Sequence, residues 1–218
     1  MNKQKIKIDI VSDVVCPWCY IGKRRLEKAV QSLTDKYDFD ITYHPFELNP
    51  QIPVTGLDQK EYLVDKFGGE ERYNQVTAHV TRIAAEEGLV FNFQKQSISP
   101  NTRNAHRIIQ WAKAFNRQIE VKEAMMRAYF TDGIDLSKTE NLIRMAESAG
   151  LNKVDVEGLL STSSGLAEVE HAEKEMQQLG ITGVPFYIIQ NKYGLSGAQP
   201  AATFVEAIEE AAASQQPE

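Results

Sequence analysis

The amino-acid sequence predicts an α/β protein in which one α/β domain is interrupted by a large all-helical insertion. Three observations support this class. A strand pattern opens the chain, apolar residues at helical spacing prevail from about residue 57 to residue 160, and strand and helix patterns return near the C-terminus. We therefore expect a discontinuous domain of residues 1–56 and 161–218, with residues 57–160 as a helical insertion subdomain.

The N-terminal elements follow from two different periodicities. Residues 5–11 (KIKIDIV) alternate between polar and apolar side chains, which predicts a strand with its isoleucines on one face. A helix should begin near Pro17, because apolar residues then recur every three or four positions. Residues 39–50 are predicted to form a second strand that Pro45 ends. The order strand, helix, strand favours parallel pairing of the two strands.

The remaining elements are read from their apolar patterns and their breakers. Within the insertion, SPNTRNAHRIIQWAKAF and SKTENLIRMAESAG each show an apolar stripe at helical spacing. After the insertion, a helix should end at Gly180, and GVPFYIIQ should form a strand. The segment NKYG then predicts a turn into a short edge strand, and PAATFVEAIEEAAA predicts the last helix.

Composition and charge exclude several classes of function. The net charge of -6 argues against a surface adapted to nucleic acid or to anionic lipid. No apolar run approaches the length of a membrane span. The N-terminus lacks the continuous apolar core of a secretory signal, so we expect a cytoplasmic protein if Met1 is the natural start.

Both cysteines of the chain lie in one motif, Cys16-Pro17-Trp18-Cys19, at the predicted change from strand to helix. A chain of 218 residues can form a core without disulfides, so these sulfurs are more typical of catalysis or metal binding. A helix N-terminus favours a thiolate. We expect Cys16 to be exposed, nucleophilic and low in pKa, with Cys19 protonated and able to resolve a mixed disulfide. Pro17 suits the first helical position.

Two other uses of the cysteines have less support. A structural disulfide between such near neighbours would close a very small loop and stabilise little. A zinc site would need two further ligands, and the four histidines are not paired at ligand spacing. We therefore predict a cycling dithiol, with no metal and no bound cofactor.

The segment GITGVPFYIIQ contains a second candidate element of the site. Pro185 stands at the head of an apolar strand and follows Val184, which makes the Val184-Pro185 bond a candidate for a cis peptide. The alternative is a trans proline that ends a loop. If the bond is cis, the backbone of Val184 could pair with an extended substrate.

Four motifs together resemble a known family. The stretches DVVCPWCYIGK, NTRNAHR, AYFTDGIDLSKTENL and GITGVPFYIIQNKYGLSGAQP are similar to the cytoplasmic FrnE-type branch of the DsbA-like thioredoxin superfamily. The resemblance implies a thioredoxin-like fold with a helical insertion and thiol-disulfide oxidoreductase activity. It further implies Cys16 as nucleophile, Cys19 as resolving cysteine, and cis-Pro185 facing them across the site.

The same resemblance brings in a competing function. Related glutathione-dependent isomerases of the hydroxychromene-carboxylate type and kappa-class glutathione transferases commonly carry serine at the position of Cys16. This chain keeps both sulfurs, which favours redox chemistry, because a serine cannot form a disulfide. A non-enzymatic, chaperone-like binder is a third possibility. Lys23 and Arg24 are expected to be surface charges.

The expected direction of the redox reaction is reduction or isomerisation. Trp18 replaces the histidine of periplasmic oxidases, so it adds no cation beside Cys16. A cytoplasmic glutathione pool would also keep a strongly oxidising couple reduced. We expect a couple between about -180 and -270 mV, with glutathione or a similar thiol as co-substrate. Partners would be disulfide-containing proteins or small molecules, and the protein would be a monomer or a homodimer.

The other candidate residues carry open alternatives. Asp13 could assist proton transfer or serve as a turn or cap residue. His106 lies off the apolar stripe of its helix; the resemblance suggests that it faces the site, whereas a solvated or capping role is equally compatible. Trp18 and Phe186 could form an apolar rim for substrate, although Phe186 also fits plain core packing.

Overall fold

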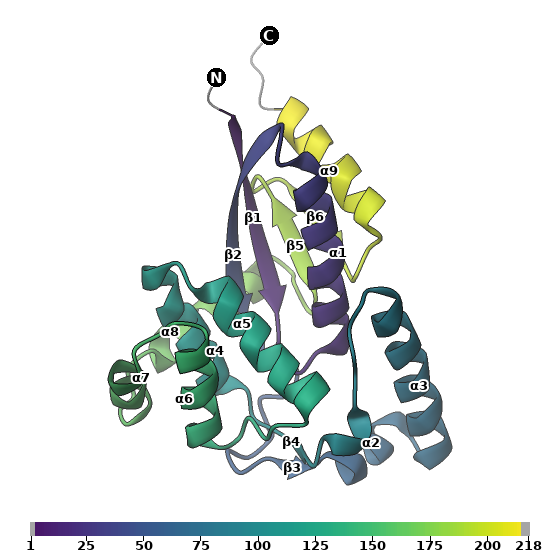
Figure 1. Cartoon of the computed structure of the whole chain (residues 1–218), viewed down its shortest axis with the longest axis vertical. Helices are drawn as coiled ribbons and strands as arrows, with labels where there is room; N and C mark the ends of the chain where they lie inside the picture. Colours follow the sequence, from purple (N-terminus) through teal and green to yellow (C-terminus); the bar gives the residue numbers. More distant parts are fainter. Residues whose placement is uncertain (1–2, 215–218) are drawn as a thin grey trace.

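The computed structural model describes residues 3–214, and its α/β part is built on a four-stranded sheet with the order β2-β1-β5-β6 (Figure 1). β1 (Gln4–Ser12) runs parallel to β2 (Tyr37–Pro45). β5 (Phe186–Ile189) runs antiparallel both to β1 and to β6 (Tyr193–Ser196). The predicted parallel pair is confirmed, and β2 ends at its proline as expected.

The alternation along β1 determines which helices cover each face of the sheet. Its three isoleucines are buried in the same core as α1 (Pro17–Leu33) and α9 (Ala201–Ala213), which pack against each other. Val11 points to the opposite face and packs with Met176 of α8 (Leu166–Gln178). Both faces are therefore covered by helices, and each buried isoleucine contributes about 1.5 to 3 kcal/mol.

The insertion lies beyond the carboxyl end of β1 (Figure 1). Buried residues of the insertion and of the α/β part belong to one continuous hydrophobic core, so the dithiol helix is packed from both sides. The insertion contains α2 (Gln59–Phe67), α3 (Glu70–Glu86), α4 (Arg103–Ala112), α5 (Gln118–Arg127), α6 (Thr139–Ser148) and α7 (Lys153–Leu160), with 3₁₀ turns at Phe93–Lys95 and Lys113–Phe115 and a π turn at Ala128–Asp132.

One feature corrects the expectation of an all-helical insertion. β3 (Leu57–Asp58) and β4 (Ile98–Ser99) pair as a short antiparallel sheet at the edge of the insertion. Strands of two residues each are too short to show an alternating pattern, so the sequence carries no periodic signal for them. Within the part of the chain that the structure describes, no helix is both long enough and apolar enough to cross a bilayer.

Candidate active site

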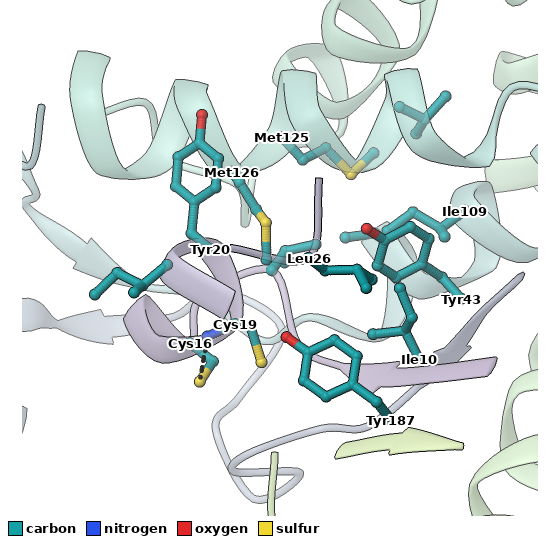
Figure 2. Close-up of a cluster of buried hydrophobic side chains, with 14 of the residues drawn as sticks. Ile10, Cys16, Cys19, Tyr20, Leu26, Tyr43, Ile109, Met125, Met126 and Tyr187 are labelled. Atoms are coloured by element: carbon teal, nitrogen blue, oxygen red, sulfur yellow. Dashed lines mark hydrogen bonds between the residues drawn. The ribbon is translucent and has the colours of Figure 1, made fainter. Parts of the chain in front are cut away.

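The dithiol lies at the N-terminus of α1 (Figure 2). Cys16 is the N-cap residue, and its Sγ atom accepts a hydrogen bond from the backbone N–H of Cys19 at 3.3 Å. Pro17 occupies the first helical position, where its missing N–H leaves no hydrogen bond unmade. Both sulfurs are free thiols in this structure. The helix N-terminus thus offers one of its unpaired N–H groups to the first sulfur.

The two sulfurs are more enclosed than expected. Cys16 is 3% exposed and Cys19 is 2% exposed, so the prediction of an exposed Cys16 is wrong. The reason is the loop before β5, in which the Val184–Pro185 peptide bond is cis, as expected. The carbonyl oxygen of Val184 lies 3.8 Å from the Sγ atom of Cys16 and accepts its weak hydrogen bond. Three segments distant in sequence therefore enclose the dithiol: the start of α1, this loop and the insertion.

The ionisation of the pair also differs from the expectation. The hydrogen bond with Cys19, together with burial, raises the pKa of Cys16 well above its usual value. Burial raises the pKa of Cys19 as well, but the hydrogen bond from Cys16 and the charge of Lys122 outweigh it and lower the pKa. The prediction that Cys16 is the more acidic thiol is therefore wrong for the free dithiol.

The cation that lowers the pKa of Cys19 is Lys122 of α5, which is 1% exposed. Its Nζ atom donates a hydrogen bond to the backbone oxygen of Ser12 at 3.1 Å and lies 5.5 Å from the ring centre of Tyr43. Burial lowers the pKa of Lys122 to about 8, against the attraction of Cys19 and Asp13. Lys122 was not among the site residues predicted from the sequence. A signal existed, because this lysine stands within the apolar stripe of its helix, three and four residues before two buried methionines.

Asp13 and His106 form a buried pair next to the dithiol. The Nε2 atom of His106 lies 3.1 Å from Oδ1 of Asp13, and each side chain is 1% exposed. The carboxylate also accepts hydrogen bonds from the backbone N–H groups of Val14 at 2.7 Å and Leu48 at 2.9 Å. Burial raises the pKa of Asp13, but the hydrogen bonds from His106 and from the backbone of Leu48, together with the charge of Lys122, outweigh burial and lower the pKa. Asp13 is thus a loop residue whose carboxylate binds two backbone N–H groups and a histidine of the insertion, and His106 faces the site rather than solvent.

A mainly apolar cavity of about 130 Å³ opens next to this pair, between the dithiol loop and the insertion. Aromatic and branched aliphatic side chains of the insertion form most of its wall, while Lys66 adds one ammonium group to the lining. The loop around the dithiol contributes Asp13, Val15 and Pro17 to the lining, and the insertion contributes residues that include Tyr62, Val80 and Phe130.

Comparison with known proteins identifies the family of this arrangement. Residues 7–209 match the DSBA-like thioredoxin domain. The chain belongs to this family. Its fold is accordingly the thioredoxin-like fold of DSBA-like proteins, in agreement with the resemblance of the four sequence motifs.

The chain is similar to a curated protein sequence and to two solved structures, among others. YwbO, an uncharacterized protein of Bacillus subtilis (strain 168), is 27% identical over 93% of this chain and 96% of its own length. The "probable DsbA oxidoreductase SCO1869" of Streptomyces coelicolor is 32% identical, with a TM-score of 0.90 over 98% of this chain and 92% of that one. The cytosolic disulfide reductase DsbM of Pseudomonas aeruginosa, solved with GSH, has a TM-score of 0.64 at 16% identity, over 95% and 96% of the two chains.

The structure also places the remaining candidate residues of this DSBA-like chain. Trp18 turns toward α3, where its ring centre lies 6.3 Å from that of His79, and it does not line the cavity. Phe186 packs with Val11 on the far face of the sheet, so core packing and not a substrate rim describes it. Lys23 is not a surface charge as expected: it is 4% exposed and is paired with carboxylates.

No group of three or more His, Cys, Asp or Glu side chains that could hold a metal ion occurs among residues 3–214. The histidines at the site and on β2 are instead engaged by single aspartates, His106 by Asp13 and His44 by Asp9. The chemistry that the described site offers is that of two adjacent thiols, a buried lysine and an apolar cavity.

Proposed function

We propose that this DSBA-like protein is a cytoplasmic disulfide reductase or isomerase that uses the Cys16/Cys19 dithiol. The observation that carries the proposal is the pair of free thiols at the N-terminus of α1, with the resolving sulfur beside a buried cation. A thiolate attacks a disulfide sulfur, and a second thiol within reach completes the exchange.

The proposed cycle balances in two halves. Cys16, losing its proton, attacks one sulfur of a substrate disulfide, which forms a mixed disulfide and releases one substrate thiol. The thiolate of Cys19 then attacks the sulfur of Cys16, which closes the Cys16–Cys19 disulfide and releases the second substrate thiol. Two molecules of glutathione or a similar thiol reduce the enzyme again and leave as their disulfide. The similarity in fold to DsbM with GSH supports this choice of co-substrate.

The proposed substrates are small or flexible disulfides with an apolar part. The cavity beside Pro17 is mainly apolar and partly enclosed by the insertion, so it suits an aromatic or aliphatic group attached to the reacting sulfur. A folded protein would have to reach a sulfur that is 3% exposed. The backbone of Val184, next to that sulfur, could pair with an extended peptide.

A second candidate is a glutathione-dependent isomerase or transferase acting on a small aromatic compound, and the apolar cavity is the observation that favours it. Such chemistry needs one activating group toward glutathione and no resolving sulfur. The two candidates therefore differ in what they require of Cys19.

The test compares wild type with Cys16→Ser and Cys19→Ser. In a glutathione-coupled assay with a small disulfide, we expect Cys16→Ser to lose turnover entirely and Cys19→Ser to accumulate the mixed disulfide, visible by mass spectrometry. Glutathione conjugation and client-aggregation assays run beside it. A Cys19→Ser variant that keeps full activity in the conjugation assay would support the isomerase or transferase instead, and protection from aggregation by both serine variants would support a chaperone.

A further inference from the structure

Lys122 is a buried cation without a carboxylate of its own. Among residues 3–214 its ammonium group has no ion pair within 4 Å, and the hydrogen bond that it donates goes to a neutral acceptor, the backbone oxygen of Ser12. Lys23, the other buried lysine nearby, is paired with Glu27 and Glu123. A buried charge that lacks a partner costs several kcal/mol, so Lys122 needs a compensating negative charge.

The groups around Lys122 leave the dithiol to supply that charge. Those that face it electrostatically are Cys19, Asp13, Cys16 and Lys23, in that order, and the ring of Tyr43 lies beside its ammonium group. Asp13 is held by His106 and by two backbone N–H groups. Lys23 carries the same sign of charge. The negative charge that Lys122 lacks can therefore come from the dithiol, through a thiolate at Cys19.

Ser12 connects Lys122 to the loop that carries the dithiol. Lys122 donates a hydrogen bond to the backbone oxygen of Ser12, the last residue of β1, and the loop that leads to Cys16 begins at the next residue. Cys19 itself is 2% exposed, so water cannot solvate a thiolate there. Without a cation, burial would hold this sulfur in the protonated and unreactive form.

We propose that Lys122 is a positioning residue of the insertion that ionises Cys19 for the step that resolves the mixed disulfide. This role rests on the proposed function. Once Cys16 is bonded to the substrate, it has no proton left to share with Cys19, and Lys122 remains as a buried cation of the site. The thiolate of Cys19 then attacks the sulfur of Cys16. The Cys16–Cys19 bond forms, the bond from Cys16 to the substrate breaks, and the departing thiolate takes a proton from solvent.

The test follows the two steps separately with the aromatic disulfide dithiodipyridine, which releases one coloured thione when Cys16 reacts and a second when Cys19 closes the disulfide. We compare wild type, Lys122→Met, Lys122→Arg and the control Lys113→Met, which removes the same charge from an exposed site of the insertion. Each unit by which the pKa of Cys19 rises removes about tenfold of its thiolate and restores about threefold in nucleophilicity. For Lys122→Met we expect a second release about three- to tenfold slower at pH 7, recovering as the pH rises.

Lys122→Arg and Lys113→Met should retain the wild-type second step, and thermal unfolding monitors folding of every variant. A merely structural role would not make the second step recover at high pH. A second release in Lys122→Met that matches wild type at pH 7 overturns the role of Lys122. A wild type that releases a single thione and never closes the disulfide overturns the proposed function instead, so the two failures are distinguishable.

Discussion

The Nε2 atom of His106 lies 3.1 Å from the Oδ1 atom of Asp13, and this buried contact joins α4 of the insertion to the residue that follows β1. Asp13 is three residues before Cys16, so the contact also connects the insertion to the loop that carries the dithiol. Docking of the insertion and placement of the first sulfur are therefore coupled through one carboxylate.

Replacing Asp13 by Asn should cost about 3 to 5 kcal/mol of unfolding free energy at pH 7, because one partner of a buried pair is removed. The pKa of Asp13 is lowered in the folded protein: burial raises it, and the hydrogen bonds from His106 and the backbone of Leu48, together with the charge of Lys122, outweigh burial. Its ionised form therefore stabilises the fold above the unfolded value of 3.8, and this contribution is lost as the pH falls below that value. Urea unfolding at pH 7 and at pH 3 measures both effects.

The cost of Asp13→Asn should accordingly shrink between pH 7 and pH 3. The exposed Asp38 offers the matched control, since Asp38→Asn removes the same charge without a buried partner. A cost that stays equal at the two pH values would show that the charge of Asp13 contributes nothing to stability.

Replacing Glu123 by Gln should weaken the docking of α5 on α1. Glu123 accepts hydrogen bonds from Tyr20 at 2.7 Å and from Lys23 at 2.6 Å, and it also pairs with Arg24. Burial raises its pKa, but the hydrogen bond from Arg24 and the charge of Lys23 lower it to about 2. The ionised form stabilises the fold above about pH 4.5 and loses this effect toward pH 2.

For Glu123→Gln we expect a loss of about 2 kcal/mol at pH 7, because hydrogen bonds to charged groups are worth about 1.5 to 3 kcal/mol. The difference from wild type should vanish as the pH approaches 2. Chemical unfolding over this pH range measures it, with Glu120→Gln on the exposed face of the same helix as control. A loss at pH 7 no larger than that of the control would contradict the prediction.

Replacing Gly22 by Ala should destabilise the start of α1. A Cβ atom at this position would lie 2.2 Å from the hydroxyl oxygen of Tyr187, which points toward the dithiol helix (Figure 2). That hydroxyl is buried and has no hydrogen-bond partner among residues 3–214. Overpacking of this kind costs about 1 to 3 kcal/mol.

Removing the hydroxyl group of Tyr187 should relieve the clash with a Cβ atom at position 22. Tyr187→Phe alone should change stability by less than about 1 kcal/mol, because the hydroxyl that it removes makes no hydrogen bond to any described residue. In that background Gly22→Ala should lose most of its cost. Gly158→Ala is the control, since nothing lies within 4 Å of a Cβ atom there. Urea unfolding of the double-mutant cycle measures the coupling, and additive costs would rule out the contact as their cause.

The reduction potential should lie at the oxidising end of the expected range, near -180 mV rather than -270 mV. Trp18 adds no cation, but Lys122 stabilises the reduced form by lowering the pKa of Cys19. Stabilising the thiolate makes the disulfide easier to reduce. Equilibration with glutathione buffers, followed by quantification of free thiols, gives the value. A potential near -120 mV would mean that the protein is a strong oxidant and that the expected direction is wrong.

Small disulfides should turn over faster than disulfides in folded proteins. The loop before β5 and the insertion leave both sulfurs almost fully buried, while the cavity beside Pro17 accepts an apolar group. Turnover with an aromatic small disulfide is compared with turnover on a folded protein disulfide and on the same protein unfolded. Equal rates for the small and the folded substrate would show that the insertion does not select by size.

The strands and the dithiol helix could be predicted because their signals are local. Alternation identifies β1, Pro45 marks the end of β2, and Pro17 marks the start of α1. Lys122 could not be assigned to the site in this way, because the Ser12 oxygen that it binds is 110 residues away. The sequence shows a lysine in an apolar stripe without showing which charge it faces.

The pKa order of the two thiols could not be predicted either, because it too depends on contacts between residues that are distant in the sequence. A helix N-terminus favours the first cysteine of such a motif, and that local argument led to a low pKa for Cys16. The folded chain adds burial of both sulfurs and the charge of Lys122, which lowers the pKa of Cys19, while burial and the hydrogen bond with Cys19 raise the pKa of Cys16. Contacts with residues distant in the sequence therefore determine which of the two thiols has the lower pKa.

The assembly of this site from distant segments has a consequence for its synthesis. The ribosome releases Cys16 and Cys19 early, whereas the loop at Pro185 that encloses them emerges 169 residues after Cys16. At about 5 to 20 residues per second, the nascent chain carries an unsheltered pair of thiols for roughly 10 to 30 seconds. During that interval the Val184 carbonyl is not yet beside Cys16, and until the 106th residue after Cys16 is added, Lys122 has not been made either. We therefore expect that newly made chains need a reducing environment to keep both thiols reduced until folding buries them.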